Sequence, residues 1–225
     1  MPPRSHALTT TESASTGGGR AVRLRGVDDL VIRPSVAEDF DGWFELFQAV
    51  ADEARWIGRE GVLDREERRL AFDETLQADD AQTFIAVQGG AVVGALFVTV
   101  DAGLGELGMM VRSAERGRGI GSALMTSCVG WCRDRQAHKV TLMVWPHNER
   151  GIALYRKFGF AVEGRLARHH RRRSGELWDV LTMGLVLDTT SPGSLLPDAS
   201  RISTSTGTGA SRGSLMSGND RHSAG

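Results

Sequence analysis

The 225-residue chain is poor in lysine, cysteine and long apolar runs, and each shortage argues against a class of protein. Its two lysines, Lys139 and Lys157, leave almost no residue for a Schiff-base mechanism, which needs a lysine nucleophile. Two cysteines, Cys128 and Cys132, are too few for a disulfide framework, and we expect both to be small core residues. No apolar run approaches the ~18 residues of a membrane span. We therefore expect a soluble globular protein.

The chain also lacks an excess of either charge. Its 27 Lys and Arg residues and 28 Asp and Glu residues give a formal net charge of −1 at pH 7. Bulk electrostatic binding to nucleic acid or to an anionic membrane needs a clear positive excess. We therefore expect neither as a partner. The N-terminal residues lack the apolar core of a secretory signal, so we expect a cytoplasmic protein.

Composition divides the chain into three segments. Residues 1–28 have few large apolar side chains, and residues 189–225 are rich in serine, threonine and glycine. Such segments cannot bury enough apolar surface to offset the entropy lost on ordering, so we expect both to be disordered tails. The intervening segment, 29–188, has the length of one ordinary domain.

Apolar periodicity in the central segment predicts alternating strands and helices. Strands are expected at 30–32, 83–87, 91–100, 106–111, 140–145, 161–173 and 176–187. Helices are expected at 39–53, 64–76, 120–135 and 149–158. Asp64, followed by Glu67, is the expected N-terminal cap of the second helix. This order is typical of an α/β domain with a mixed sheet.

Two glycine-rich segments are candidates for binding a phosphate. Residues 103–108 match G-x-G-x-x-G, but a predicted strand follows, so we interpret this match as accidental. Residues 111–122 lie between a predicted strand and a predicted helix. Their glycines would let backbone N–H groups approach an anion at a helix N-terminus, and Arg116 and Arg118 would add positive charge. A simple glycine-rich turn is the alternative.

A further segment, 148–160, follows the strand predicted at 140–145. Taken alone, Asn148 fits a helix cap, and Tyr155 fits a packing residue. Tyr155 is, however, the single tyrosine of the chain.

Together these two segments resemble the GNAT superfamily of N-acetyltransferases, and the resemblance covers about residues 30–187. The first carries the family's V-x-x-x-x-R-x-x-G-x-G signature at Val111, Arg116, Gly119 and Gly121. The second carries N-x-x-A-x-x-L-Y-x-x-x-G-F in part, with Gly151 in place of the usual alanine. The continuation is similar to a bacterial branch that acts on amino acids and other small amines.

The resemblance implies an α/β fold with a mixed, mostly antiparallel central sheet flanked by helices. Two neighbouring parallel strands, 106–111 and 140–145, would splay apart and form the acetyl-CoA cleft. Backbone amides would hold the pyrophosphate, and the main chain of the first splayed strand would pair with the pantetheine. The residues implied to bind acetyl-CoA are Met110, Val111, Arg116, Gly117, Arg118, Gly119, Gly121, Ser122 and Asn148.

The implied chemistry is direct transfer of an acetyl group from acetyl-CoA to a primary amine. Tyr155 falls at the family's general-acid position and would protonate the departing thiolate. A backbone amide near Met110 or Val111 would donate to the oxyanion. Glu106 matches a position where many relatives carry a catalytic glutamate, and a structural ion pair is its alternative. Glu53 is a rival base that could instead bind substrate.

The expected acceptor is a small-molecule amine such as an amino acid, and a homodimer is compatible with this hypothesis. The alternatives are a protein N-terminal acetyltransferase and a non-catalytic acyl-CoA-binding module. Tyr155 and Glu106 favour catalysis, because a pure binding module needs neither. Residues near Trp56, Ile57 and the hairpin at 165–176 would select the acceptor.

The hairpin carries a basic run at 165–173 with two open interpretations. It is either a solvated hairpin or a surface that attracts an acidic acceptor or the phosphates of CoA. His169 and His170 lack accompanying ligands at metal spacing, so we expect no metal site.

Overall fold

The computed structural model describes residues 22–23 and 30–187. Apart from residues 22–23, the tails predicted at 1–28 and 189–225 lie outside these described residues. The strands are β1 (Val22–Arg23), β2 (Val31–Pro34), β3 (Ala81–Gln88), β4 (Ala91–Asp101), β5 (Leu104–Val111), β6 (Lys139–Val144), β7 (Ala161–Arg171) and β8 (Leu177–Val186). The helices are α1 (Phe40–Asp52), α2 (Arg65–Gln77), α3 (Ile120–Asp134) and α4 (Glu149–Lys157), with short 3₁₀ turns at Ala37–Asp39 and Ser113–Glu115.

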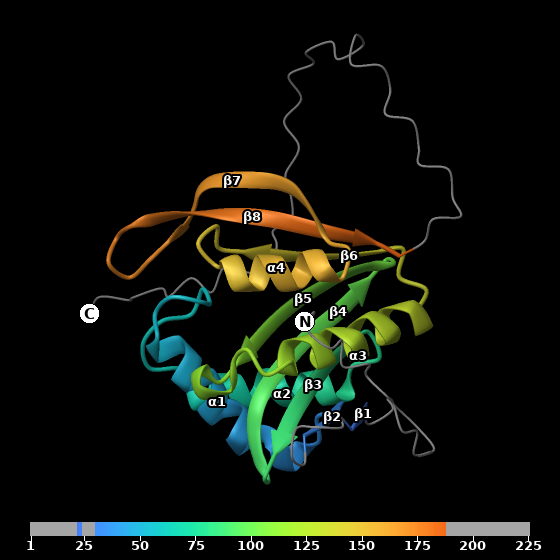
Figure 1. The fold of residues 1–225 in the computed structure, drawn as a ribbon. Helices are drawn as coiled ribbons and strands as arrows, with labels where there is room; N and C mark the ends of the chain where they lie inside the picture. Colours follow the sequence, from blue (N-terminus) through green and yellow to red (C-terminus); the bar gives the residue numbers. More distant parts are fainter. Residues whose placement is uncertain (1–21, 24–29, 188–225) are drawn as a thin grey trace, which may run out of the picture. The chain divides into compact units, whose positions relative to one another are not determined.

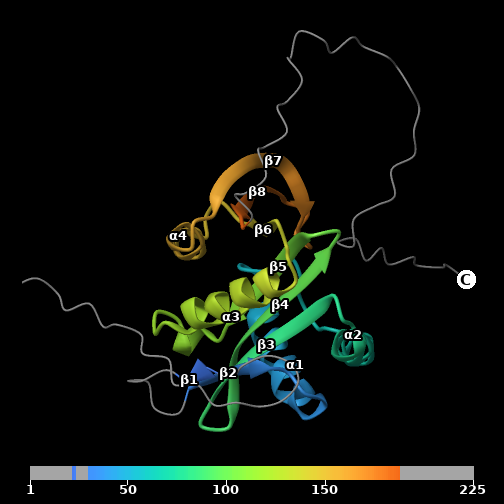
Figure 2. The same cartoon turned by 90° about the vertical axis from the view of Figure 1, so that its right-hand side faces the viewer.

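The strands form one sheet in the order β1-β2-β3-β4-β5-β6-β8-β7. Every neighbouring pair is antiparallel except β5 and β6, which are parallel. Helices α3 and α4 cover one face of the sheet, and α1 and α2 cover the other (Figures 1 and 2). The predicted mixed, mostly antiparallel sheet flanked by helices is therefore confirmed. β1 was not predicted. No helix of the described chain is both long enough and apolar enough to cross a membrane.

Each face of the sheet has its own apolar core, built from residues at helical spacing. On α3, Ile120, Leu124 and Cys128 are at most 1% exposed and pack on the strands. On α1, Leu46 and Val50 are buried on the opposite face. Because these side chains recur every four residues, each helix presents one continuous apolar stripe to the sheet. Cys128 and its neighbour Cys132 are buried free thiols, as predicted.

Local signals also determine two connections. The Asp64 carboxylate accepts hydrogen bonds from the backbone N–H groups of Glu66 and Glu67, which confirms it as the cap of α2. Between β4 and β5, Ala102 and Gly103 both have positive φ, as a two-residue hairpin turn requires. The first glycine pattern thus belongs to a β-hairpin and not to a nucleotide-binding loop.

The parallel pair β5 and β6 separates partway along its length. Pairing runs from Leu104 opposite Lys139 to Leu107 opposite Leu142 and then ends. β5 nevertheless continues to Val111 beside β4, and β6 continues beside β8. The predicted splay is therefore confirmed. Main-chain groups along the facing edges need another partner, such as solvent or a ligand.

β7 contains a bulge that curves it over β8 (Figure 2). Residues 167–169 of β7 lie opposite Asp179 alone. Arg168 has φ +52°, and its N–H donates to Asp179 Oδ1 at 2.7 Å. The strand ends at Arg171, two residues earlier than predicted. Arg172 therefore lies in the hairpin turn, where its side chain makes contacts outside the sheet.

Candidate active site

The loop that enters α3 presents backbone N–H donors that have no partner among the described residues. Gly119 is the N-cap residue with φ +88°, and no side chain caps the helix. The Ala123 N–H donates to the Gly119 carbonyl at 3.1 Å, so the N–H groups of residues 120–122 have no acceptor within the helix. A Cβ at Gly119, or at Gly117 with φ +81°, would meet no atom of the described residues within 4 Å. Both glycines therefore lie under open space, where a ligand can approach the backbone closely.

Gly121 serves packing as well. A Cβ at this position would lie 2.9 Å from Leu154 Cδ2 and 3.6 Å from Met109 Cε. Its absence lets α3 approach both α4 and β5. The first turn of α3, the helix that carries Tyr155 and the splayed strand are therefore packed together.

Arg116 connects this loop to the C-terminal end of α1. Its Nε donates to the Val111 carbonyl at 2.9 Å, and its two terminal nitrogens donate to the Glu53 carboxylate at 2.7 and 2.5 Å. The same carboxylate accepts a hydrogen bond from Trp56 Nε1 at 2.6 Å. Arg116 thus braces the loop in this structure, and its contact with acetyl-CoA stays a prediction. Arg118 pairs with the nearby Glu115 carboxylate.

Glu53 is held as a carboxylate. The hydrogen bonds from Arg116 lower its pKa most, burial partly opposes them, and the bond from Trp56 lowers the pKa further. A carboxylate stabilised in this way is a weak proton acceptor. The structure therefore favours a bracing role for Glu53 over its role as a rival base.

The Glu53–Arg116 pair should make stability depend on acidity. A pKa lowered by folding contributes stability above the unfolded value, and this contribution is lost as pH falls through the folded value. We expect Glu53→Gln to lower the melting temperature at pH 7. This gap, the difference in melting temperature between variant and wild type, should shrink below about pH 4.5. Thermal denaturation between pH 7 and pH 3 measures this gap. Glu74→Gln, on the exposed face of α2, should show no gap; a Glu53→Gln gap that persists undiminished at pH 3 would contradict the assignment.

Tyr155 lies on α4 with its ring in the core. The residue is 7% exposed, and its ring centroid lies 6.0 Å from that of Phe160. Burial raises the pKa of its hydroxyl to about 12, so the phenol is protonated at neutral pH. The part of the chain that the structure describes provides no hydrogen-bond partner for this hydroxyl. The Tyr155 hydroxyl is therefore protonated and donates no hydrogen bond to any described residue.

Asn148 positions the helix that carries Tyr155. Its side-chain oxygen accepts a hydrogen bond from the Gly151 N–H at 3.0 Å and caps α4. A Cβ at Gly151 would lie 2.8 Å from Asn148 Nδ2. The glycine that replaces the family's usual alanine thus leaves room for the cap. A direct contact of Asn148 with acetyl-CoA stays a prediction.

Glu106 lies on the other face of the sheet. Leu107 packs in the core beside α3, so Glu106 and Met110, which alternate with it, point toward the α1 side. Glu106 is opposite Thr141, in the last paired stretch before the splay. Its side chain is exposed and makes no ion pair with any described residue. Glu106 therefore lies on the opposite face of the sheet from Tyr155, one residue before the last pair that joins β5 to β6.

An aromatic cluster lies beyond the end of β6. Trp56 and the hairpin at 165–176, which contribute to it, were predicted to lie near the acceptor, but Trp145, His147 and Trp178 were not. Trp145 is 5.4 Å from Trp178 and 5.2 Å from His170, and His147 is 5.0 Å from Trp178 and 6.0 Å from Trp56, between ring centroids. Burial and the nearby Arg172 charge lower the pKa of His170. The cluster joins four segments that are distant in sequence, so local periodicity contained no signal for it. Among the described residues, no group of three or more His, Cys, Asp or Glu is arranged to hold a metal ion.

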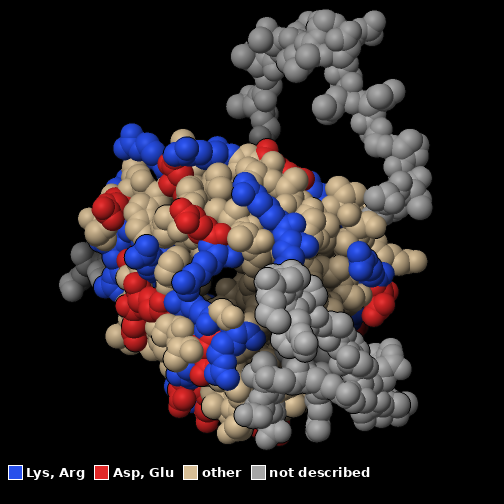
Figure 3. Space-filling model, in the orientation of Figure 1, with Lys and Arg blue, Asp and Glu red and all other residues tan. Residues whose placement is uncertain are grey.

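Basic side chains border a hollow near α4 and the loop that enters α3. Figure 3 shows the hollow between α4 and the loop that enters α3, in the orientation of Figure 1. The N-terminus of α3 therefore lies beside a concave surface that has several basic side chains at its rim.

The chain belongs to the acetyltransferase (GNAT) family, whose sequence model matches residues 43–160. A mycothiol acetyltransferase of Acidimicrobium ferrooxidans is 31% identical over 132 residues, which are 56% of this chain and 41% of that protein. An L-amino acid N-acetyltransferase of Escherichia coli is 31% identical over 108 residues, which are 45% of this chain and 66% of that protein. The chain therefore spans less than two thirds of each of these relatives.

The fold is shared with solved acetyltransferase structures. A phosphinothricin acetyltransferase from Sinorhizobium meliloti, solved in complex with acetyl-CoA, superposes with a TM-score of 0.64 at 22% identity. The match covers 70% of this chain and 88% of that structure. The sheet and its flanking helices are thus a fold that this chain shares with that acetyltransferase.

Proposed function

We propose that the protein is an acetyl-CoA-dependent N-acetyltransferase that acetylates the primary amine of a small molecule, such as an amino acid. One observation carries this proposal: an uncapped helix N-terminus adjoins a gap between two parallel strands, with Tyr155 and Glu106 on the two faces of the sheet. A module that only binds acyl-CoA would need neither a protonated phenol nor an exposed carboxylate beside the gap.

The residues present fit acetyl-CoA. The free N–H groups of residues 120–122 and the open space over Gly117 and Gly119 suit a pyrophosphate. The main chain of Met110 and Val111, on the splayed part of β5, would pair with the pantetheine. When bound, acetyl-CoA supplies the activated acetyl thioester.

The side chains divide the proton transfers between the two faces of the sheet. The exposed Glu106 carboxylate can accept the proton that a protonated amine must lose before it attacks. On the α4 side, Tyr155 holds a proton at its phenolic oxygen and can donate it to the departing thiolate of CoA. The separation keeps the two groups from exchanging the proton directly.

The acceptor class rests on the relative named as an L-amino acid N-acetyltransferase. A screen that measures CoA release from acetyl-CoA with L-amino acids, polyamines, aminoglycosides and peptides tests it. Release with amino acids supports the proposal, and release with peptides alone would favour a protein acetyltransferase. If calorimetry shows that acetyl-CoA binds, but no amine of the screen causes release of CoA, a non-catalytic binding module would be favoured.

Replacement of the proposed base should have a pH-dependent effect. Glu106→Gln keeps the size of the side chain but cannot accept the proton, so we expect kcat/KM at pH 7 to fall by roughly 10²–10⁴. The loss should diminish at high pH, where the acceptor amine is already neutral. Steady-state kinetics between pH 6 and pH 10 with the best acceptor of the screen measure both effects. Equal pH profiles for variant and wild type would exclude Glu106 as the base.

A further inference from the structure

Arg172 is buried, although it lies in a hairpin turn between two exposed arginines. Its side chain is 2% exposed, whereas Arg171 and Arg173 are exposed, although Arg173 also donates from its guanidinium to the Glu60 carbonyl at 3.4 Å. A fully buried arginine is rare unless its charge and its donors are paired. The buried Arg172 guanidinium must therefore be paired within the protein.

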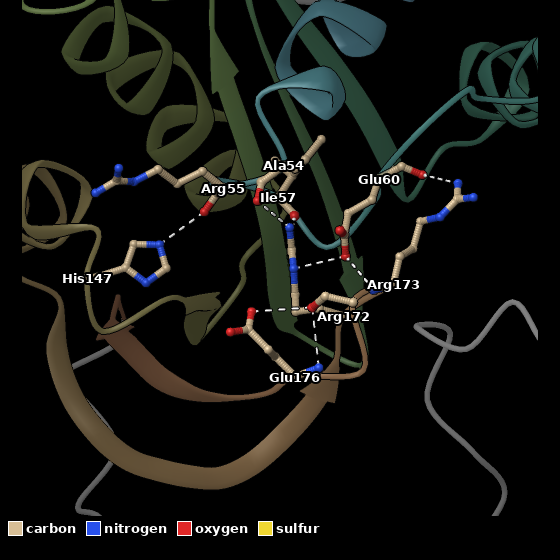
Figure 4. A network of polar contacts seen from close by, with 9 residues as sticks. Ala54, Arg55, Ile57, Glu60, His147, Arg172, Arg173 and Glu176 are labelled. Carbon is tan, nitrogen blue, oxygen red and sulfur yellow. Dashed lines mark hydrogen bonds and ion pairs between the residues drawn. The ribbon is translucent and has the colours of Figure 1, made fainter.

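All three guanidinium nitrogens of Arg172 contact one segment, residues 53–61, which connects α1 to α2. Nε lies 2.9 Å from the Glu60 carboxylate, and the terminal nitrogens donate to the carbonyls of Ile57 at 3.0 Å and Ala54 at 2.6 Å. Figure 4 shows the side chain inserted between the hairpin and this segment. The guanidinium carbon also lies 4.1 Å from the centroid of the Trp178 ring. Arg172 is thus fully committed to contacts within the protein and is not available to bind an acidic acceptor.

The segment depends on such contacts for its conformation. It contains neither a helix nor a strand, so no regular hydrogen-bond ladder holds it. Ala54 has φ +48°, a conformation that is uncommon for a residue other than glycine, and its carbonyl accepts one of the Arg172 bonds. Arg172 therefore stabilises a backbone conformation that the segment would not readily adopt alone.

The same segment joins both walls of the splayed gap. At one end, Glu53 binds Arg116, which also bonds to the last residue of β5. On the other side, His147, which follows β6, lies 3.1 Å from the Arg55 carbonyl and beside the Trp56 ring. Trp56 itself packs on the α1 side of the sheet, the face on which Glu106 lies. The segment therefore lies on the same face of the sheet as the proposed base Glu106.

We propose that Arg172 is a positioning residue that fixes the 53–61 segment and thereby shapes the acceptor side of the active site. This inference rests on the proposed acetyltransferase function. Loss of the anchor should release Trp56 and raise the acceptor KM. Acetyl-CoA affinity should be retained, because Arg116 keeps its bond to the Val111 carbonyl on β5, and its partner Glu53 is the C-cap residue of α1 and so is held by that helix.

The first test needs no substrate. Trypsin cleaves after arginine, and Arg55 and Arg59 are exposed within the segment. We expect Arg172→Met to speed the appearance of peptides ending at these residues by roughly tenfold, because a released segment opens more often. Arg171→Met, an exposed neighbour, is the matched control and should cleave at the wild-type rate. Equal cleavage in Arg172→Met and wild type would overturn the anchoring role.

The second test uses the L-amino acid that gives the most CoA release with the wild type. We expect Arg172→Met to raise its KM by roughly tenfold, with the Kd for acetyl-CoA changed by less than about twofold. Arg172→Lys should resemble Arg172→Met, because one ammonium group cannot reproduce three bonds from a planar fork. Faster cleavage with an unchanged acceptor KM would overturn the link to the acceptor site, as would full rescue by lysine.

Folding is checked by circular dichroism before either test. If Arg172→Met does not fold, Glu60→Gln replaces it, because this variant weakens the charged contact and keeps a hydrogen-bond acceptor. Faster cleavage and a higher acceptor KM in Glu60→Gln would support the role of Arg172, and wild-type values for both would overturn it. A wild-type protein that acetylates no amine contradicts the proposed function instead, so the two failures are distinguishable.

Discussion

Tyr155→Phe is expected to lower kcat by roughly 10²–10⁴ while the protein stays folded. The change removes one oxygen and keeps the ring that packs beside Phe160. Acetyl-CoA affinity should change much less, because a general acid acts mainly on charge that develops during the reaction. Steady-state kinetics on the best acceptor and calorimetry with acetyl-CoA measure the two effects.

The environment of Tyr155 also predicts how much stability the Tyr155→Phe variant should lose. Its hydroxyl bonds to no described residue, so stability should change by no more than about 1.5 kcal/mol, the net scale of one hydrogen bond. A residue that serves packing alone would show the reverse: near-normal kcat in Tyr155→Phe and a serious loss only in Tyr155→Ala. An undiminished kcat in Tyr155→Phe, with chemistry shown to be rate-limiting, would defeat the proposed role.

Gly119→Asp is expected to weaken acetyl-CoA binding by roughly 10²-fold. The position lies at the uncapped start of α3 under open space, where the pyrophosphate would bind. Two unit charges 4 Å apart interact by about 4 kcal/mol near a protein surface, and solvent ions reduce this repulsion. Isothermal titration calorimetry with acetyl-CoA at low and high salt measures both the loss and its screening.

Gly119→Asn separates charge from conformation. Both variants place a side chain of the same size at φ +88°, which asparagine and aspartate tolerate better than most residues. Any strain or local capping is therefore similar in the two variants. We expect Gly119→Asn to bind acetyl-CoA more tightly than Gly119→Asp. The difference in affinity should become smaller at high salt. If folded Gly119→Asp binds acetyl-CoA with wild-type affinity, the pyrophosphate does not bind at this loop.

The parts of the site predictable from sequence are those encoded by local spacing. The apolar stripe of α3, the Asp64 cap and the positive-φ glycines before α3 each depend on residues a few positions apart. Two short signatures placed on predicted strands and helices were then sufficient to predict the family architecture, including the splay of β5 and β6. Such features form from backbone geometry and nearby side chains, so they are visible in a single sequence.

Contacts between distant segments were decided by the tertiary structure alone. Arg116 was expected only to supply charge for a ligand, yet its partner Glu53 lies 63 positions away. The run at 165–173 was interpreted as either solvated or ligand-attracting, yet Arg172 bonds to the Ala54 carbonyl 118 positions away. Neither pairing has a periodic signal. Each depends on the order of strands in the sheet and on the bulge in β7, which together bring the hairpin against the α1–α2 connection. Local spacing therefore determined the elements and the glycine-rich loop before α3, whereas long-range packing decided which of the charged residues hold distant segments together and which stay exposed.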